Sequence, residues 1–567
     1  MKRFGLGLAL ALVGLFGCED KKPSPTPPPV SVAKASASAS SKPAGAPVTL
    51  SIAYGSEKKA WLEDELKKFA ATNPTTPSGR PIKVTTSALG SGDAVHQIED
   101  GSLKPHVFSP ASSAYVRILN DEWLSTAGRT KPIAPNVGDT LVTSPVVIAM
   151  WKPMAEALGW PSKPISWNDM LKVAGDPKGW AGKGFPEWGR FKYGHCSPEF
   201  SNSGYLAVLA EAYAGAKKTR ELTLADLDAK PTLDFLTKVE GTVVYYGKST
   251  GFYADKMVER GPKYLSAAVL YENLVVESYK KGSSMPLVAV YPSEGTFWSD
   301  HPWTVLDAPW VGEEEKAAAQ VLSTFLRAKP AQQDALAAGF RPGDPSIAID
   351  APVDLAHGVD PKQPQTVLPL PEPKVLEKLF QTWKLTKKGA DVVFVFDKSG
   401  SMDGRPLEEA KKGAKAFLDN LSDQDEVALL FFDSTVYPVV GPMKLATGRA
   451  QLETRLDGTV AGGGTALYDA IAQAYDLEAK RAEKNPNQIH AVVVMTDGKD
   501  ESSKLTLAPL KAKFPTEEAV VKVFTIAYGS QAESKVLDQI AASAAGSAVK
   551  GSTTDIKDVY LEMSSYF

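Results

Sequence analysis

Five side chains in the last third of the chain could together bind a metal ion. All carry oxygen, two as carboxylates and three as hydroxyls: Asp397, Ser399, Ser401, Thr465 and Asp497. Hard divalent cations take oxygen ligands, and Mg²⁺ in particular keeps several waters in an octahedral shell. If these side chains meet, they predict a site for Mg²⁺, with Mn²⁺ or Ca²⁺ as alternatives.

Alternating apolar runs and helical patterns must position these residues. Residues 391–396 form an apolar run that ends at Asp397, and residues 491–495 form another that leads to Asp497. Between them, a run of glycines delivers Thr465 to the start of a helical pattern. Strands alternating with helices predict a doubly wound parallel sheet, in which the strand ends share one edge. Further strands are expected over residues 427–432 and 520–528, and helices over residues 407–421, 467–475 and 555–567.

This spacing resembles the metal-ion-dependent adhesion site of von Willebrand factor type A domains. That family has Asp-x-Ser-x-Ser, a distant Thr and a distant Asp, and the chain has every element in this order. The resemblance implies that Ser399, Ser401 and Thr465 contact the metal directly. It also implies that the aspartates act largely through water and that a protein partner's carboxylate completes the shell. A type A fold that had lost its metal would lack a ligand, whereas none is missing here.

Strand and helix patterns also alternate from Val48 onward. Apolar runs at residues 48–53, 82–84 and 106–108 each lead into a Gly/Ser-rich turn and a helical pattern. In open α/β sheets, ligands bind beyond the carboxyl ends of the strands, where helix N-terminal N–H groups point outward. Residues 143–151 then read as a buried strand that could carry the chain between two lobes, and residues 197–205 as another Ser/Gly turn before a helix.

The order of these elements resembles bacterial periplasmic-type solute-binding proteins, which have two α/β lobes with a ligand in the cleft. The fold class expected for the whole chain is therefore α/β, a two-lobed module followed by the type A domain. The resemblance implies a cleft with hydroxyl groups suited to an oxyanion or a polyol: Ser56, Ser91, Ser112, Ser203, Tyr271 and Tyr291. The alternative is that these residues merely cap helices.

The two modules are expected to span residues 48–340 and 389–567, joined by a connector over residues 341–388. Eight prolines fall between Arg341 and Pro373. Proline removes a backbone donor and restricts its predecessor, so residues 341–373 are predicted to be semi-extended.

The first 47 residues read as an export signal and a tether. Lys2 and Arg3 precede a short apolar run that ends at Cys18, which is too short to span a bilayer. This resembles the bacterial lipoprotein signal, and the resemblance implies that Cys18 is lipidated and becomes the N-terminus. An ordinary signal peptide with an incidental cysteine is the alternative. Residues 19–47 are rich in Pro, Ala and Ser and predict a flexible spacer.

Composition excludes several classes of function. The 567 residues allow three or four domains, and 63 Lys and Arg against 66 Asp and Glu leave no positive excess for nucleic acid. The two cysteines, Cys18 and Cys196, provide no disulfide framework, and the six histidines show no H-E-x-x-H spacing.

The sequence therefore predicts an exported, lipid-anchored binding protein in the periplasm or at the cell exterior, and not an enzyme. Its type A domain would capture a protein partner through a metal-bridged acidic residue, beside a module that could hold a small solute. The alternative is a substrate-binding receptor of an ABC-type transport system, with the type A domain serving for docking. A metal-dependent hydrolase is disfavoured because no general base with a partner can be named outside the metal site.

Overall fold

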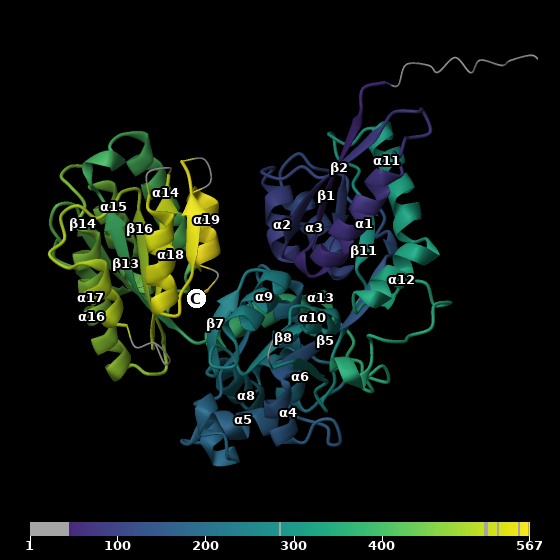
Figure 1. Ribbon diagram of the computed structural model, residues 1–567, viewed down its shortest axis with the longest axis horizontal. Helices are drawn as coiled ribbons and strands as arrows, with labels where there is room; N and C mark the ends of the chain where they lie inside the picture. Colours follow the sequence, from purple (N-terminus) through teal and green to yellow (C-terminus); the bar gives the residue numbers. More distant parts are fainter. Residues whose placement is uncertain (1–44, 283–284, 515–519, 530–531, 554–555, 565) are drawn as a thin grey trace, which may run out of the picture. The chain divides into compact units, whose positions relative to one another are not determined.

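The computed structural model describes residues 45–567, apart from residues 283–284, 515–519, 530–531, 554–555 and 565. Cys18 and residues 19–44 of the predicted spacer lie outside the described residues. The described strands form three sheets with helices packed on them (Figure 1). None of the described helices combines the length and the apolar character that a membrane crossing requires.

The first lobe contains a five-stranded sheet with parallel and antiparallel pairs. Its strands in spatial order are β2 (Ile82–Leu89), β1 (Val48–Gly55), β3 (Val107–Ser109), β11 (Pro302–Val305) and β4 (Asp139–Thr140). The strand β1 pairs in parallel with β2 and β3, and β11 runs antiparallel to β3 and β4. The helices of this lobe are α1 (Lys59–Ala71), α2 (Ser91–Glu99), α3 (Ala114–Ser125), α11 (Glu313–Leu326) and α12 (Lys329–Ala337).

The second lobe is built on a seven-stranded sheet. Its main path is β10 (Trp298–Ser299), β5 (Val142–Trp151), β8 (Ala267–Tyr271), β6 (Tyr193–Cys196) and β7 (Val243–Gly247); β9 (Leu287–Val290) and β12 (Arg341–Pro342) also pair with β5. Its helices are α4 (Lys152–Leu158), α5 (Trp167–Gly175), α6 (Asn202–Ala216), α7 (Leu224–Asp228), α8 (Lys230–Glu240), α9 (Thr250–Arg260) and α10 (Glu272–Lys280). The buried run predicted to be a strand is β5.

The helix α6 runs through the core of the second lobe. Every residue from Asn202 to Gly215 is buried, which is typical of a helix covered on all sides by protein. Its first turn brings Asn202 and Ser203 to the carboxyl ends of the strands, and its third turn carries the buried Glu211.

The last part of the 341–388 connector is a helix, which begins where the segment predicted to be semi-extended ends. Helix α13 (Pro373–Thr386) begins with proline in the first turn, where no backbone donor is lost to the helix. It packs against α6, α7 and α8 of the second lobe and buries Leu379 and Trp383. Seven of the eight prolines precede α13 and the eighth, Pro373, is its first residue, while the apolar spacing after Pro373 sets the helix.

The C-terminal domain has a six-stranded sheet that is parallel except at one edge. Its strands in spatial order are β15 (Val440–Lys444), β14 (Glu426–Phe432), β13 (Ala390–Asp397), β16 (Ile489–Thr496), β17 (Val521–Tyr528) and β18 (Ala548–Gly551). Only β15 pairs antiparallel. The helices are α14 (Arg405–Asn420), α15 (Leu445–Asp457), α16 (Leu467–Lys484), α17 (Leu507–Ala512), α18 (Ser534–Ser543) and α19 (Ile556–Ser564).

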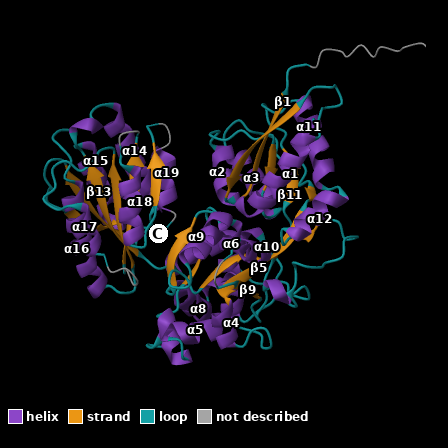
Figure 2. Cartoon of the chain, in the orientation of Figure 1, coloured by secondary structure: helices purple, strands orange, loops and turns teal. Residues whose placement is uncertain are grey.

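Helices cover both faces of this sheet (Figure 2), and the central strand β13 is buried on both sides. Phe394 packs on one face against Phe417 of α14 and Tyr560 of α19, with ring centroids 5.5 Å apart in each pair. Val393 and Val395 point into the core on the other face. A strand covered on both faces needs a continuous apolar run, which is the pattern that predicted it. The predicted α/β fold class is confirmed.

Candidate functional sites

Asp397 lies at the carboxyl end of β13 and is held by two hydrogen bonds. Its Oδ1 accepts from the Ser399 backbone N–H over 2.7 Å, and its Oδ2 accepts from the Thr496 hydroxyl over 2.5 Å. Thr496 ends the neighbouring strand β16, in parallel register with β13. The sequence prediction gave Thr496 no role, although its place directly before Asp497 was the available signal.

Three of the predicted ligands form a chain of short contacts. The Ser399 and Ser401 hydroxyl oxygens are 3.1 Å apart, and the Ser401 hydroxyl donates to Asp497 Oδ1 over 2.7 Å. Adjacent ligands of an octahedral Mg²⁺, each about 2.1 Å from the ion, are about 3.0 Å apart. The separation of the two serine oxygens therefore suits two neighbouring positions in such a shell.

Thr465 joins this group from the glycine-rich loop. A Cβ added to Gly498 would lie 3.2 Å from Thr465 Oγ1 and 3.8 Å from Ser401 Oγ, which places both hydroxyls beside the same backbone position. Gly400 N–H donates to Gly463 O over 2.9 Å, so the glycine-rich loop is bound to the loop that carries the serines. All five predicted metal-site residues are thus brought to one edge of the sheet.

The electrostatics of this edge suit a cation. Burial raises the pKa of Asp397 to about 6 and also raises the pKa of Asp497, although hydrogen bonds from Thr496 and Ser401 act in the opposite direction. No ion pair joins Asp397 or Asp497 to a cation in the described part of the chain, and burial penalises the charge of both carboxylates. Together with three hydroxyl oxygens, this donor set fits a hard divalent ion.

A neighbouring aspartate, Asp433, was not singled out in the sequence. It follows β14 and accepts from Lys398 Nζ over 2.5 Å and from the Tyr437 hydroxyl over 2.6 Å. Burial would raise the pKa of Asp433, but these two donors lower it. Lys398, the variable residue of the Asp-x-Ser-x-Ser motif, therefore neutralises a carboxylate next to the predicted metal ligands.

Five of the six predicted cleft residues lie where strands end or helices begin, but their hydroxyls already have partners. Ser91 Oγ accepts from Ala111 N–H over 3.0 Å, and Ser112 Oγ accepts from Ala114 N–H over 3.2 Å. The Ser203 and Thr250 hydroxyl oxygens are 2.7 Å apart. The Ser56 hydroxyl accepts from the Ser249 hydroxyl, and the Tyr271 hydroxyl accepts from the Asn202 side-chain amide.

Tyr291 lies elsewhere. Its hydroxyl donates to Glu272 Oε2 and accepts from Asp360 N–H, and the residue lines a separate cavity with Pro364 and Ile165. The prediction that placed Tyr291 in the cleft with the other hydroxyls is therefore corrected. Tyr291 directly follows β9, and its side chain faces Glu272.

The two lobes touch directly at the cleft. Ser56 Oγ accepts from Gly251 N–H over 2.9 Å and from the Ser249 hydroxyl over 2.7 Å. Phe200 O accepts from Gly92 N–H over 3.0 Å. The close approach requires glycine, because a Cβ at Gly92 would lie 2.2 Å from Glu199 O. The lobes are therefore in a closed arrangement.

Behind these contacts, buried polar atoms remain without a hydrogen-bond partner among the described residues. They come from both lobes and from the segment between β10 and β11: Ser109 Oγ, Tyr115 OH, Asn202 Oδ1 and His301 Nε2. Tyr115 and Tyr205 pack edge to face across the lobes, with ring centroids 6.4 Å apart. Buried polar groups are nearly always paired, so each of these atoms has an unused hydrogen-bonding capacity.

A buried charged triad lies beside this cluster. Lys58 Nζ donates to Glu57 Oε1 over 2.9 Å, and His301 Nδ1 lies 3.2 Å from the same carboxylate. Burial would raise the pKa of Glu57, but Lys58 and His301 lower it to about 2. Glu57 and Lys58 therefore form a buried ion pair with the His301 ring beside it.

Cys196 lacks the environment of a nucleophile. Its thiol is fully buried, and burial raises its pKa to about 11 although the Ser201, Ser203 and Thr250 hydroxyls act in the opposite direction. A reactive thiol needs a lowered pKa and access to substrate.

Family comparisons agree with this architecture. The family model described as "Bacterial extracellular solute-binding protein" matches residues 50–341, slightly more than half of the chain. The chain belongs to this family of bacterial extracellular solute-binding proteins. It also carries a von Willebrand factor type A domain, which matches over residues 391–560.

Curated relatives match about a quarter of the chain. An uncharacterised protein of Synechocystis sp. is 30% identical over 157 residues, which is 28% of this chain and 36% of that protein. The magnesium-chelatase 67 kDa subunit of Chlorobaculum parvum is 30% identical over 149 residues, 26% of this chain and 24% of that protein. The chain thus spans 36% of the length of the first relative and 24% of the length of the second.

Solved structures are similar to each module in turn. The sulfate-binding protein SubI from Mycobacterium tuberculosis is 19% identical with a TM-score of 0.38, covering 55% of this chain and 92% of that one. A periplasmic thiamin binding protein is 12% identical with a TM-score of 0.42, covering 60% and 96%. A von Willebrand factor type A protein from Catenulispora acidiphila is 25% identical with a TM-score of 0.28, covering 32% and 42%.

Proposed function

We propose that this protein is a membrane-anchored, extracytoplasmic binding protein whose type A domain captures a protein partner through a divalent cation. The observation that carries the proposal is the convergence of Ser399, Ser401 and Asp497 through contacts of 3.1 and 2.7 Å, with Thr465 beside them. An extracellular solute-binding module in the same chain supports action outside the cytoplasm.

Each residue has a defined part in this proposal. Ser399, Ser401 and Thr465 supply neutral oxygens to Mg²⁺, or to Mn²⁺ or Ca²⁺ in its place, while Asp397 and Asp497 contribute charge through water. A cation held by few direct anions supplies an open position with affinity for an external carboxylate. The role of Thr496 is to orient Asp397 by its hydrogen bond.

The metal part of the proposal is tested with Mn²⁺ as the probe. The full chain is titrated with Mn²⁺ and free ion is followed by electron paramagnetic resonance, for the wild type, Asp397→Ala and Asp403→Ala. Asp403 is exposed and lies two residues after Ser401 but is not one of the five predicted ligands, so it serves as the control. We expect Asp397→Ala alone to lose binding, and equal binding by all three chains would refute the site.

Partner capture is tested on cell-envelope extract with the full chain immobilised. Capture should occur with Mg²⁺, fail with EDTA and fail with Asp397→Ala. A protein retained equally under all three conditions would show that the contact does not use the metal site.

The anchor is proposed at Cys18 and is tested separately. The chain offers a matched control, because Cys196 is its only other cysteine and is buried. Metabolic labelling with a fatty-acid analogue should be lost in Cys18→Ser and retained in Cys196→Ser. Unchanged labelling of Cys18→Ser would remove the anchor from the proposal.

A second function, a receptor that delivers a solute to an ABC-type transporter, is favoured by the unpartnered atoms in the closed cleft. A polar solute could take hydrogen bonds from Tyr115 OH and offer donors to Asn202 Oδ1. The test is calorimetric titration of the full chain with sulfate, phosphate and simple polyols, comparing the wild type with Asn202→Leu. Binding that the variant loses supports the receptor, and silence with every probe favours a module that serves only as a scaffold.

A further inference from the structure

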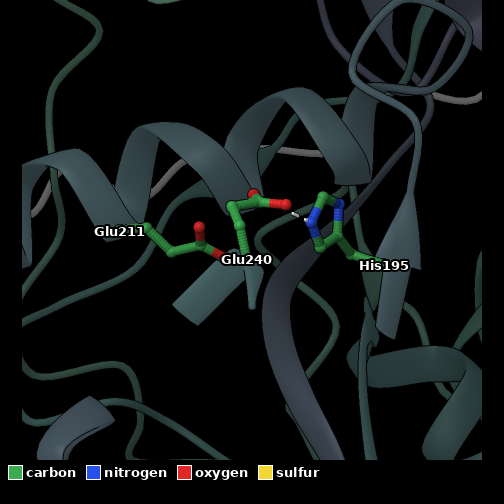
Figure 3. Close-up of side chains that lie close together, drawn as sticks. All are labelled: His195, Glu211 and Glu240. Carbon is green, nitrogen blue, oxygen red and sulfur yellow. Dashed lines mark hydrogen bonds and ion pairs between the residues drawn. The ribbon is translucent and has the colours of Figure 1, made fainter. Parts of the chain in front are cut away.

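Three side chains with metal-binding atoms meet in the core of the second lobe, far along the sequence from the type A site. They are His195 of β6, Glu211 of α6 and Glu240 at the end of α8, and each is fully buried. Their ligating atoms all lie within 4.8 Å of one another. Figure 3 shows the Glu211 and Glu240 carboxylates and the His195 ring directed toward one another.

The hydrogen bonds around the cluster fix the histidine tautomer. His195 Nδ1 lies 2.7 Å from Cys196 O, and because a carbonyl oxygen only accepts, Nδ1 must carry the hydrogen. The other ring nitrogen, Nε2, lies 3.2 Å from Glu240 Oε1 and either carries a second hydrogen or presents its lone pair there. Two acceptors would repel one another at this distance unless a positive charge lay between or beside them.

The two carboxylates are held from outside by phenols. Tyr193 donates to Glu211 Oε1 over 2.9 Å, and Tyr246 donates to Glu240 Oε2 over 2.6 Å. The inner oxygen Glu211 Oε2 is buried and has no hydrogen-bond partner among the described residues. Three acceptor atoms, one from each side chain, are thus turned inward, and every outer atom is already paired.

We propose that His195, Glu211 and Glu240 form a buried structural site for a divalent transition-metal ion of the zinc class. One imidazole nitrogen and two carboxylate oxygens are ligands that Zn²⁺ accepts at about 2.0 to 2.2 Å. Ligands of a tetrahedral ion at these lengths are about 3.4 Å apart, close to the 3.2 Å between His195 Nε2 and Glu240 Oε1.

The surrounding groups match the outer shell of a metal site. A ligating histidine usually donates its other N–H to a backbone carbonyl, and ligating carboxylates are themselves hydrogen-bonded. Cys196 O, Tyr193 and Tyr246 fill these places. Because all three ligands are fully buried, the ion would enter as the lobe folds, and its role would be to join β6, α6 and α8.

Two protons could offset the negative charge of the two carboxylates without a metal, one on His195 Nε2 and one on Glu211. Burial and the charge of Glu240 raise the pKa of Glu211 well above its usual value, so a proton there is the direct competitor of the ion. The two accounts predict opposite effects of Glu211→Gln. This amide cannot replace an anionic metal ligand, but it can donate to Glu240 as a protonated Glu211 would.

The experiment uses the full chain with Asp397→Ala, so that the type A site does not contribute metal. The protein is unfolded in urea with EDTA, dialysed, and refolded with or without Zn²⁺. Bound zinc is measured by mass spectrometry, and thermal stability by tryptophan fluorescence. We expect about one zinc per chain and a higher Tm with zinc. Adding Glu211→Gln should abolish both, whereas Glu259→Gln, on the exposed face of α9, should change neither.

The proton account gives a different result. A correctly refolded chain that retains no zinc, and whose Tm rises on Glu211→Gln regardless of metal, overturns the proposal. Circular dichroism of each refolded variant identifies misfolding. If Glu211→Gln does not refold, His195→Gln replaces it, and zinc retained by that variant equally contradicts the site.

Discussion

The Ser401 hydroxyl donates to Asp497 Oδ1 over 2.7 Å across 96 positions of sequence. This contact joins the loop after β13 to the loop after β16, the two central strands of the type A sheet. It therefore places a hydroxyl of the Asp-x-Ser-x-Ser motif beside the distant aspartate through the parallel pairing of the strands.

Thr496→Val should weaken metal binding without unfolding the type A domain. The Thr496 hydroxyl donates to Asp397 Oδ2, and loss of a residue that orients a metal ligand typically costs about 10- to 100-fold in affinity. The measurement is the Mn²⁺ titration described above. Thr525→Val is the matched control, because Thr525 is a buried threonine on the next strand whose hydroxyl donates to Leu537 O. Equal loss in both variants would indicate a general effect of removing a hydroxyl.

Acid should destabilise the solute-binding module through Glu57 and His301. The pKa of Glu57 is lowered to about 2 in the folded state, so its stabilising contribution is complete above its usual pKa of 4.5 and is lost as the pH falls toward 2. Burial and the Lys58 charge lower the pKa of His301, so protonation of the unfolded chain below pH 6.5 acts in the same direction. Stability should therefore decrease steadily from pH 7 downward.

The substitution that tests the role of Glu57 in this pH dependence is Glu57→Gln. It leaves Lys58 buried beside a neutral amide, and breaking a buried ion pair in this way costs about 3 kcal/mol or more at pH 7. The variant should also lose much of the pH dependence below pH 5. Urea unfolding followed by tryptophan fluorescence measures this, because all eleven tryptophans precede residue 391. Parallel curves for both chains between pH 7 and pH 3 would contradict the assignment.

Gly92→Ala should hold the two lobes apart. The new Cβ would lie 2.2 Å from Glu199 O, a distance that no side chain can relieve because the opposing atom is backbone. We expect a larger radius of gyration by small-angle scattering and a loss of about 1 to 3 kcal/mol in the stability of the closed module. Gly175→Ala is the control, since nothing lies within 4 Å of a Cβ at that position. An unchanged radius of gyration for Gly92→Ala would show that the closed contact is not maintained in solution.

Helix α13 should contribute stability to the second lobe. Leu379 is buried, and Leu379→Ala should cost about 2 to 5 kcal/mol. Leu385 lies in the same helix but is 75% exposed, so Leu385→Ala should change stability by less than about 0.5 kcal/mol. Urea unfolding followed by tryptophan fluorescence measures both effects, because Trp383 and the other ten tryptophans all precede residue 391. Similar effects of the two substitutions would mean that α13 is not packed as described.

The elements that position the type A site were predictable because their signals are local. β13 contains the apolar run 392–396 and ends at Asp397, and β16 contains the apolar run 491–495 and ends at Thr496, directly before Asp497. β15 gave no such signal, since it is an exposed edge strand that contains Gly441 and Pro442. Edge strands need few apolar residues, so an apolar-run criterion does not find them.

The interior polar contacts could not be read from spacing. His195 and Glu240 are 45 positions apart and belong to a strand and a helix with no shared motif. Tyr291 was assigned to the cleft only because it follows a strand, and that assignment was wrong. Which way such a side chain faces depends on packing of the whole lobe, here on Glu272.

The passage from α13 to β13 takes only residues 387–389, because the helix ends at Thr386 and the strand begins at Ala390. Three residues span at most about 11 Å when fully extended. Any rearrangement that displaces α13 therefore pulls on the first central strand of the type A sheet, whose other end carries Asp397. Because α13 packs against α6, α7 and α8, this short passage keeps the start of β13 beside the second lobe.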